Sequence, residues 1–308
     1  MPELVTSTRK MLFWSILLAS GLGAQEEGQA GGEFTAAARQ ESNVDMSALR
    51  REKQIYDLIA SFEGLDAEER LEEASEVFVG ARYALSPLGE GRPPDSDPRI
   101  RFDAFDCTTY VETVVAMALS RAFDEVRPNL DSLRYRDGSP SFEARHHLPV
   151  AQWIPAFTRR GLLIEATRDY GAEETRTVRL RTSPELWRKR TRARALSLEA
   201  ENVPTATFEV DYVPIDRASQ LLAGSSEVLL LNVVRSSEEG SPIVVTHQAL
   251  LFPADGGPRV RHASSVHGGV VEMTLSRFVA GQALARKWPV VGLNVQRWSL
   301  PSAAPAEE

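Results

Sequence analysis

The sequence predicts an α+β protein in which helices come first and an antiparallel sheet follows. Two observations favour this class. In the first half of the chain, apolar residues recur three and four positions apart, as they do on one face of a helix. From Glu227 onward, short runs rich in valine, leucine and isoleucine are separated by turns that contain glycine or proline. The ordered part, expected over 46–300, is long enough for one large domain.

The first half is expected to hold four helices. The second opens with the acidic turn Asp66-Ala67-Glu68-Glu69, which suits the positive end of a helix dipole. A loop rich in proline and glycine spans 87–98 and precedes the third helix, which opens near Cys107. The helices are predicted at 46–62, at 66–82, from about 107 to 118, and at 151–160, the last carrying Trp153.

The second half is expected to form the sheet. Its strand candidates are rich in β-branched and other apolar residues and end at turn signals. They are predicted at 228–234, 243–252, 258–263, 270–275 and 290–298, with a short helix at 276–285. Residues 165–225, between the two halves, are interpreted as an insertion in the same domain.

The two ends of the chain are predicted to lie outside this domain. Arg9 and Lys10 precede an apolar run over 11–18 and small residues that end at Ala24, which is the pattern of a secretory signal peptide. Residues 1–24 are therefore expected to be removed, leaving a secreted protein, periplasmic or extracellular. Because no later stretch approaches about 20 apolar residues, no stable membrane insertion is expected after cleavage. A polar flexible linker is predicted over 25–45 and a disordered tail over 301–308.

The charge of the chain disfavours nucleic acid as a partner. The formal net charge is −8 at pH 7, whereas a nucleic-acid-binding surface needs an excess of basic residues. The eight basic side chains between Thr175 and Arg194 are the main local exception. Among them, the stretch Arg188–Arg194 could contact an anionic polymer, but a solvated helix face is the simpler interpretation of such a run.

Cys107 is the only cysteine of the chain, and it precedes a helical pattern of apolar residues. A helix N-terminus stabilises a thiolate over a thiol, so the pKa of Cys107 is predicted to be lowered. Either Asp106 or Thr109 could be the N-cap, and both choices leave Cys107 at the helix mouth. A buried structural cysteine is the alternative. An unpaired thiol outside the cytoplasm is a hazard unless it is buried or used, which favours a nucleophile.

Two of the five histidines suit a catalytic pair with this thiol. His247 lies inside one predicted strand and His262 lies in the next, with a turn near 254–258 between them. Adjacent antiparallel strands could place the two imidazoles side by side, so that one takes the proton from sulfur and the other orients it. His146 and His147 are adjacent and diverge in an extended segment, and with no cysteine or spaced-histidine cluster the sequence predicts no metal site and no cofactor.

These residues resemble a known family. Asp106-Cys107-Thr108-Thr109-Tyr110-Val111-Glu112 is similar to the D-C-T-T-[FY]-V-E string of the N-acetylmuramoyl-L-alanine amidase-like family, in the NlpC-type branch of the papain-like cysteine hydrolases. Leu133-Arg134-Tyr135-Arg136-Asp137-Gly138 resembles its R-Y-R-x-G segment, and His262-Ala263-Ser264 its H-A-S string. Two segments depart from the pattern: His247-Gln248-Ala249 stands for H-V-G, and Gly224-Ser225 for Gly-Asp.

The resemblance implies a papain-like α+β fold, with the nucleophile at a helix N-terminus packed on a small antiparallel sheet. It implies that Cys107 is the nucleophile, His247 the general base and then acid, and His262 the residue that orients His247. Peptidoglycan or its muropeptide fragments are the implied substrate, and protein partners are not readable. Candidate substrate-binding residues are Tyr83, Asp106, Thr108, Arg134, Arg136 and Arg145, because stem peptides carry carboxylates that arginine can hold.

Three functions are compatible with this reading. An N-acetylmuramoyl-L-alanine amidase ranks first. An endopeptidase that cuts between D-glutamate and diaminopimelate ranks second, since relatives in the superfamily cut there. A wall-binding protein without activity ranks third, because it should lack a catalytic residue and none is missing.

Overall fold

A computed structural model describes residues 46–188, 199–236, 243–285 and 287–301. The predicted signal peptide, the linker and all but the first residue of the predicted tail lie outside the described residues, as does most of the basic run after Arg188. The described helices are α1 (Met46–Ala60), α2 (Ala67–Glu76), α3 (Cys107–Ala118), α4 (Val126–Arg134), α5 (Ile154–Arg159), α6 (Thr167–Gly171), α7 (Pro184–Arg188), α8 (Ile215–Leu221) and α9 (Leu275–Ala283). None of them is long and apolar enough to span a membrane.

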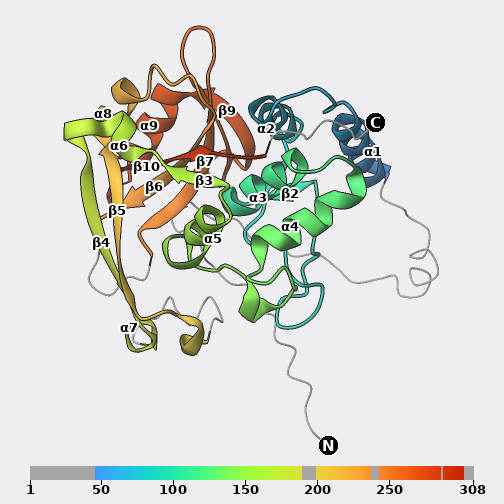
Figure 1. The fold of residues 1–308 in the computed structure, drawn as a ribbon, viewed down its shortest axis with the longest axis horizontal. Coiled ribbons are helices and arrows are strands. Elements are labelled where there is room, and N and C mark those ends of the chain that lie inside the picture. Colours follow the sequence, from blue (N-terminus) through green and yellow to red (C-terminus); the bar gives the residue numbers. More distant parts are fainter. Residues whose placement is uncertain (1–45, 189–198, 237–242, 286, 302–308) are drawn as a thin grey trace, which may run out of the picture.

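The strands build one sheet (Figure 1). They are β1 (Arg82–Tyr83), β2 (Ala104–Phe105), β3 (Leu163–Glu165), β4 (Arg176–Thr182), β5 (Ala206–Pro214), β6 (Leu229–Arg235), β7 (Val245–Phe252), β8 (Arg259–Ser264), β9 (Gly269–Thr274) and β10 (Val290–Trp298). Their order is β2-β1-β9-β8-β7-β6-β10-β5-β4, and β3 pairs with β10 off this path. Only the β1–β2 pair is parallel among these described pairs.

The predicted α+β class is confirmed, but the expectation of a small sheet is wrong, because the sheet has ten described strands. The predicted insertion supplies part of the difference: β4 and β5 pair along seven residues and extend the sheet at one edge. Their alternation was readable in the sequence, since Leu180 and Thr182 are buried whereas Arg179 and Arg181 are exposed. The exposed arginines alternate with the buried residues, which is the period-2 pattern of a strand.

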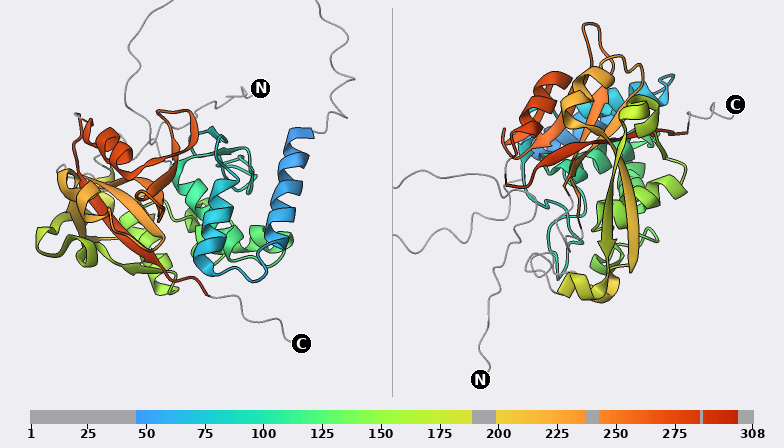
Figure 2. Two further views of the ribbon diagram at one scale, coloured as in Figure 1. Left: turned by 90° about the horizontal axis from the view of Figure 1, so that it is seen from above. Right: turned by 90° about the vertical axis from the view of Figure 1, so that its left-hand side faces the viewer.

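Helices cover the two faces of the sheet. Seen from above in Figure 2, α1 to α4 lie beside the strands as a separate layer. Apolar side chains of α1 to α4 form one core with Leu230, Leu250 and Phe252 of the sheet. On the opposite face, α8 and α9 pack through residues such as Phe278 on Ala249 and Leu251. Two apolar faces explain why the central strands read as nearly continuous apolar runs.

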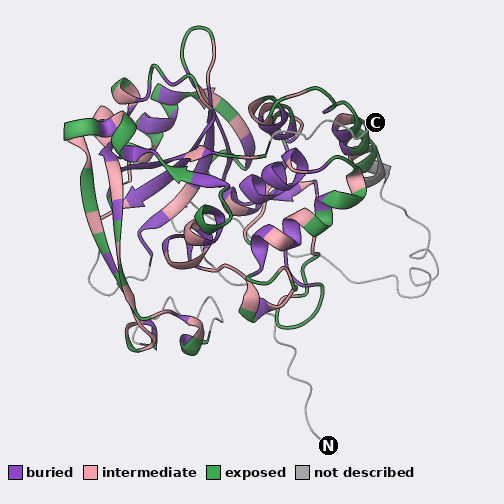
Figure 3. Cartoon of the chain, viewed as in Figure 1, coloured by how far each residue is buried: buried purple, intermediate pink, exposed green. Residues whose placement is uncertain are grey.

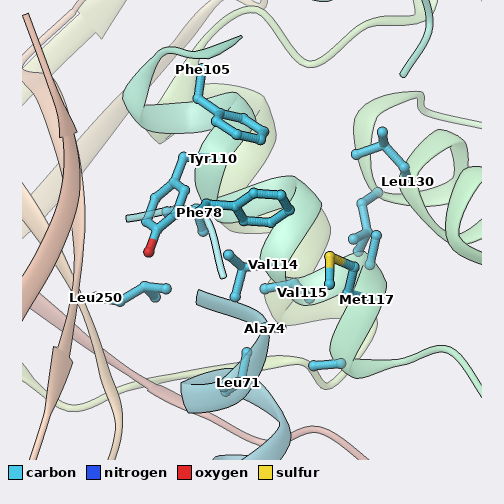
Figure 4. Close-up of a cluster of buried hydrophobic side chains, with 14 of the residues drawn as sticks. Leu71, Ala74, Phe78, Phe105, Tyr110, Val114, Val115, Met117, Leu130 and Leu250 are labelled. Atoms are coloured by element: carbon cyan, nitrogen blue, oxygen red, sulfur yellow. The ribbon is translucent and has the colours of Figure 1, made fainter. Parts of the chain in front are cut away.

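The centre of the first core is α3, in which eleven of twelve residues are buried (Figure 3). Figure 4 shows Phe78, Phe105 and Tyr110 gathered around its first turns, with the Phe78 and Phe105 ring centroids 4.7 Å apart. The Tyr110 hydroxyl points toward the sheet and donates a 3.1 Å hydrogen bond to the Ser75 carbonyl. Burying each such ring contributes about 1.5–3 kcal/mol, so the helix that carries Cys107 is held firmly.

Two predicted helix boundaries shift for local reasons. The second predicted helix ends at Glu76 instead of residue 82, because Gly80 takes a positive φ of 87° and Arg82–Tyr83 pairs with its neighbours as β1. The helix predicted at 151–160 is preceded by a π-helical turn, Pro149–Trp153, and becomes regular only at Ile154. The other predicted helices and strands are confirmed to within a few residues.

Candidate active site

The first turn of α3 is fixed by a reciprocal cap. Asp106 Oδ1 accepts from the Thr109 backbone N–H at 2.8 Å, and Thr109 Oγ1 accepts from the Asp106 backbone N–H at 3.0 Å. Asp106 Oδ2 also accepts from the Ser86 backbone N–H at 3.1 Å. Asp106 is therefore the N-cap and Cys107 the first helical residue. The Asp106 carboxylate is thus engaged in fixing the start of α3, and its predicted contact with substrate stays a prediction.

Cys107 is almost fully buried, with 3% of its surface exposed. The pKa of the thiol is raised to about 12, mainly by burial and in part by the charge of Asp106, and hydrogen bonds from the Gln248 backbone and from Thr108 offset only part of this rise. The predicted lowering of this pKa is therefore wrong for the free protein. The loss of water around the sulfur raises the thiol pKa by more than the helix dipole lowers it. The negative charge of the N-cap residue, Asp106, acts in the same direction as burial.

His247 and His262 form a direct pair across β7 and β8. His247 Nε2 lies 2.8 Å from His262 Nδ1, and the two rings are nearly perpendicular at 82°. The ring of Phe278, in α9, packs on His262 with the centroids 5.1 Å apart. The predicted adjacency of the two imidazoles is confirmed, and the hairpin between the strands is its cause.

Both imidazoles are neutral at pH 7. Burial lowers the pKa of His247 to about 4, with a further contribution from Arg235. Burial also lowers the pKa of His262 well below its usual value, helped by repulsion from His247. His262 Nε2 is buried with no hydrogen-bond partner among the described residues. If Nδ1 of His262 accepts from His247, this Nε2 carries the hydrogen.

The backbone of Gln248 connects the thiol to the strand that carries His247. Helix α3 packs against β7 and β8, and the Gln248 backbone that reaches Cys107 directly follows His247 in β7. Within the described part of the chain, no hydrogen bond joins Cys107 Sγ to either imidazole; its side-chain contact is with Thr108 Oγ1 at 4.0 Å. Catalytic hydrogen bonds are often long in a free enzyme and tighten when substrate binds.

A chain of buried amides, which the sequence analysis missed, supports this region. Gln248 Nε2 donates to Asn232 Oδ1, and Asn232 Nδ2 donates to Asn294 Oδ1, both at 3.0 Å. Asn294 Nδ2 in turn donates to Glu165 Oε2 at 2.9 Å and to Thr167 Oγ1 at 3.1 Å. The chain crosses β7, β6 and β10, and it explains the glutamine where the family motif has valine. A lone asparagine inside an apolar strand was the available signal.

Arg134 is buried and its guanidinium is already paired. Only 3% of its surface is exposed, and its Nη1 donates to Glu112 Oε2 at 2.8 Å. Trp153 Nε1 donates to the other oxygen of Glu112 at 2.9 Å. Arg134 therefore ties α4 to α3, and its predicted role in substrate binding stays a prediction.

The remaining predicted substrate residues are dispersed. Arg145 is paired with Glu90 at 2.6 Å and Asp95 at 2.9 Å, so its guanidinium is already engaged. Arg136 is exposed and donates to the backbone of residue 143 at 3.1 Å. Tyr83, in β1, and Thr108, beside the nucleophile, are half-buried. The Thr108 hydroxyl contacts the sulfur of Cys107.

The described residues contain no group of three or more histidine, cysteine, aspartate or glutamate side chains placed to bind a metal ion. His146 and His147 serve different surroundings. His147 Nε2 lies 2.6 Å from the Phe142 carbonyl, to which it donates, and burial lowers the pKa of His147 to about 3. His146 instead lines a cavity between α4 and α5.

A family model described as AmiA-like, N-acetylmuramoyl-L-alanine amidase-like, matches residues 73–284. The chain belongs to this family. The matched segment contains Cys107, His247 and His262. No protein of curated function matches the amidase-like chain.

Solved structures share its fold. A Legionella pneumophila protein of family DUF1460 is 24% identical with a TM-score of 0.71, over 82% of this chain and 96% of its own. An N-acetylmuramoyl-L-alanine amidase from Bacteroides uniformis is 24% identical with a TM-score of 0.56, over 76% and 99%. A putative xylanase from Bacteroides fragilis is 24% identical with a TM-score of 0.54, over 73% and 99%. At this identity the likeness establishes the fold alone.

Proposed function

We propose that this amidase-like protein is an exported cysteine hydrolase of the NlpC-type, papain-like class, and that it cleaves the amide bond between N-acetylmuramic acid and L-alanine in peptidoglycan or its fragments. The observations that carry the proposal are the His247–His262 pair, 2.8 Å apart, and the position of the only thiol of the chain at the start of α3, which packs against the two strands that carry the histidines. Membership of the amidase-like family supports the choice of bond.

The hydrogen bond between the histidines supports one division of their proposed roles. Because His247 Nε2 is engaged with His262 Nδ1, the Nδ1 of His247 is the atom left to take the thiol proton. His262 then accepts from His247 Nε2–H and stabilises the imidazolium that forms. His262 itself stays neutral, as its burial requires.

The reaction starts from a neutral pair and ends in a neutral pair. The Cys107 proton moves to His247 as sulfur attacks the lactyl carbonyl carbon, and a tetrahedral intermediate forms. His247 returns the proton to the amine of L-alanine, the C–N bond breaks, and a muramoyl thioester remains on Cys107. Water, deprotonated by His247, then hydrolyses the thioester and restores the thiol. The intermediate's oxygen would be met by free backbone N–H groups of the first turn of α3.

A pair that is neutral at rest makes the reactive ion pair depend on substrate. With the thiol pKa near 12 and the His247 pKa near 4, charge separation in the free protein is unfavourable. When a substrate carbonyl is bound beside the thiol, its oxygen takes up the negative charge as the sulfur attacks. Export, predicted from residues 1–24, would place this chemistry at the cell wall, where a buried thiol is also protected from oxidation.

Mass spectrometry of muropeptides incubated with the purified protein tests the proposal. Wild-type protein should release intact peptide from the sugar, and Cys107→Ala should release none. His247→Gln should lower the rate by about 10²–10⁴-fold, as for loss of a general base. His267→Gln is the matched control, because it replaces an exposed histidine outside the pair and should keep activity.

Cleavage within the peptide would move the scissile bond and overturn the amidase assignment while keeping the cysteine chemistry. Activity that survives Cys107→Ala, in a protein whose circular dichroism matches wild type, would refute the nucleophile. Detection of the protein in the periplasm or medium, with its N-terminus at residue 25, tests the predicted export.

A further inference from the structure

A concave site lies between the end of α4 and the end of α5. It is a cavity of about 400 Å³, and Cys107, His247 and His262 are not among its lining residues. Three arginines, Arg136, Arg159 and Arg160, line it together with His146. Asp137 is the one carboxylate in the lining.

Among the residues that the structure describes, the arginines of this cavity have no acidic partner. Arg160 donates to Ser132 through its backbone carbonyl and, at 2.6 Å, through its hydroxyl. Arg136 donates to a backbone carbonyl, and Arg159 has no hydrogen bond or ion pair among the described residues. By contrast, Arg134 and Arg145, which neighbour them in the sequence, are both paired with carboxylates. Guanidinium groups gathered without counter-charges offer a site for an anion.

The pKa of His146 reflects the positive charge of these arginines. The pKa of His146 is lowered to about 4, mainly by burial and in part by the charges of Arg159, Arg136 and Arg160. The charge of Asp137 acts in the opposite direction. The imidazole is thus neutral at pH 7 and can still donate one N–H. No side-chain hydrogen bond of His146 is present among the described residues, so this donor is available to a ligand.

We propose that this cavity binds an anionic ligand through Arg159, Arg136 and His146, and that the ligand group is a carboxylate. The choice of carboxylate rests on the proposed function, because peptidoglycan stem peptides carry free carboxylates. The site contains no nucleophile, so it holds a part of the substrate or product that does not react.

The cavity walls are tied to the catalytic helix. Arg134, whose backbone carbonyl accepts from the His146 N–H at 2.9 Å, pairs with Glu112 of α3. Trp153, just before α5, donates to the same Glu112. One carboxylate on the cysteine helix therefore fixes both walls, and the cavity keeps its shape without a ligand.

Binding is tested on full-length Cys107→Ala protein, so that the result does not depend on catalysis. The Cε1–H resonance of His146 is followed by NMR during titration with glutarate, the dipeptide L-Ala-D-Glu, or inorganic phosphate. A carboxylate bound among the arginines should raise the pKa of His146 by at least about 1. Arg159→Gln should weaken glutarate binding by about tenfold, as expected for loss of one charge-assisted hydrogen bond.

Arg181→Gln is the matched control, since Arg181 is an exposed arginine of β4 with the same charge and no acidic partner among the described residues. It should change glutarate binding by less than about twofold. An unmoved His146 resonance overturns the site, and so does an equal effect of the two arginine variants. Binding of phosphate alone overturns the carboxylate assignment. Glutarate binding by a protein whose wild type cleaves no muropeptide would uphold the site and refute the proposed function.

Discussion

The buried ion pair between Glu112 and Arg134 is expected to dominate the response of this protein to mutation. Both side chains are about 3% exposed, and the pair joins α3 to α4 beneath the cysteine. Arg134→Met removes the cation and leaves Glu112 with Trp153 as its donor. A buried carboxylate without its counter-charge is costly, because water cannot solvate it.

The cost can be estimated from the structure. Breaking a fully buried pair by removing one partner lowers the free energy of unfolding by about 3–5 kcal/mol. Since a domain is stabilised by only about 5–15 kcal/mol, this is a large fraction of the total. At about 2–4 °C per kcal/mol for a domain of this size, the melting temperature should fall by roughly 6–20 °C. Glu112→Gln should cost a similar amount, because it leaves a buried cation.

The double variant distinguishes lost pairing from lost packing. Glu112→Gln with Arg134→Met removes both charges and should cost less than the sum of the single changes. Burial raises the pKa of Glu112, and loss of the arginine raises it further, so the deficit of Arg134→Met should shrink as pH falls and the carboxyl takes up a proton. Urea unfolding followed by tryptophan fluorescence measures each term.

Lys53→Gln is the control, because the Lys53–Asp57 pair is exposed and worth at most about 1 kcal/mol. A loss below about 1 kcal/mol for both single variants of the buried pair would refute the reasoning. If Arg134→Met instead kept its stability and raised KM, Arg134 would be the substrate residue that the sequence predicted.

Three further outcomes follow from buried polar groups. The pKa of His147 is about 3 in the folded protein and about 6.5 in the unfolded chain, so the unfolded chain binds more protons between these values and the free energy of unfolding should fall by about 1.4 kcal/mol per pH unit from about pH 6 to 4. His147→Gln should remove this contribution to the pH dependence of the urea midpoint, and an unchanged dependence would contradict it. Iodoacetamide should alkylate Cys107 at pH 7.5 at least about 100-fold more slowly than free cysteine, since its pKa is about 12; a rate that saturates near pH 7 would show a stable thiolate instead. Asn232→Leu should lower the free energy of unfolding by about 1–3 kcal/mol for each amide left unpaired, on Gln248 and Asn294, and a loss below 1 kcal/mol in urea unfolding would mean that these amides find other partners.

Sequence reasoning succeeded where the determinant is local. The cap residue and the spacing of His247 and His262 around one turn are short-range features, and the structure places Asp106 as the cap and the two rings side by side. The roles of these residues in catalysis stay predictions. Spacing along the chain fixes a hairpin register, and the register then brings the side chains together.

It failed where the determinant is a partner far along the chain. Arg134 is engaged by Glu112, which lies 22 residues earlier in the chain. The residues next to an arginine in the sequence do not reveal such a partner. The thiol pKa likewise depends on how completely the surrounding core excludes water. Motif matching therefore named candidate reactive groups but could not distinguish a free guanidinium from an engaged one.

The position of β10 has a consequence for biosynthesis. This last strand of the described chain lies inside the sheet, between β6 and β5, and it also pairs with β3. Until it is inserted, β6 and β5 each present an unpaired edge, and such edges recruit strands from other molecules. A chain cut before Val290 is thus expected to aggregate instead of surviving as a smaller enzyme. We therefore expect a cell to contain either the complete folded protein or an insoluble fragment of it.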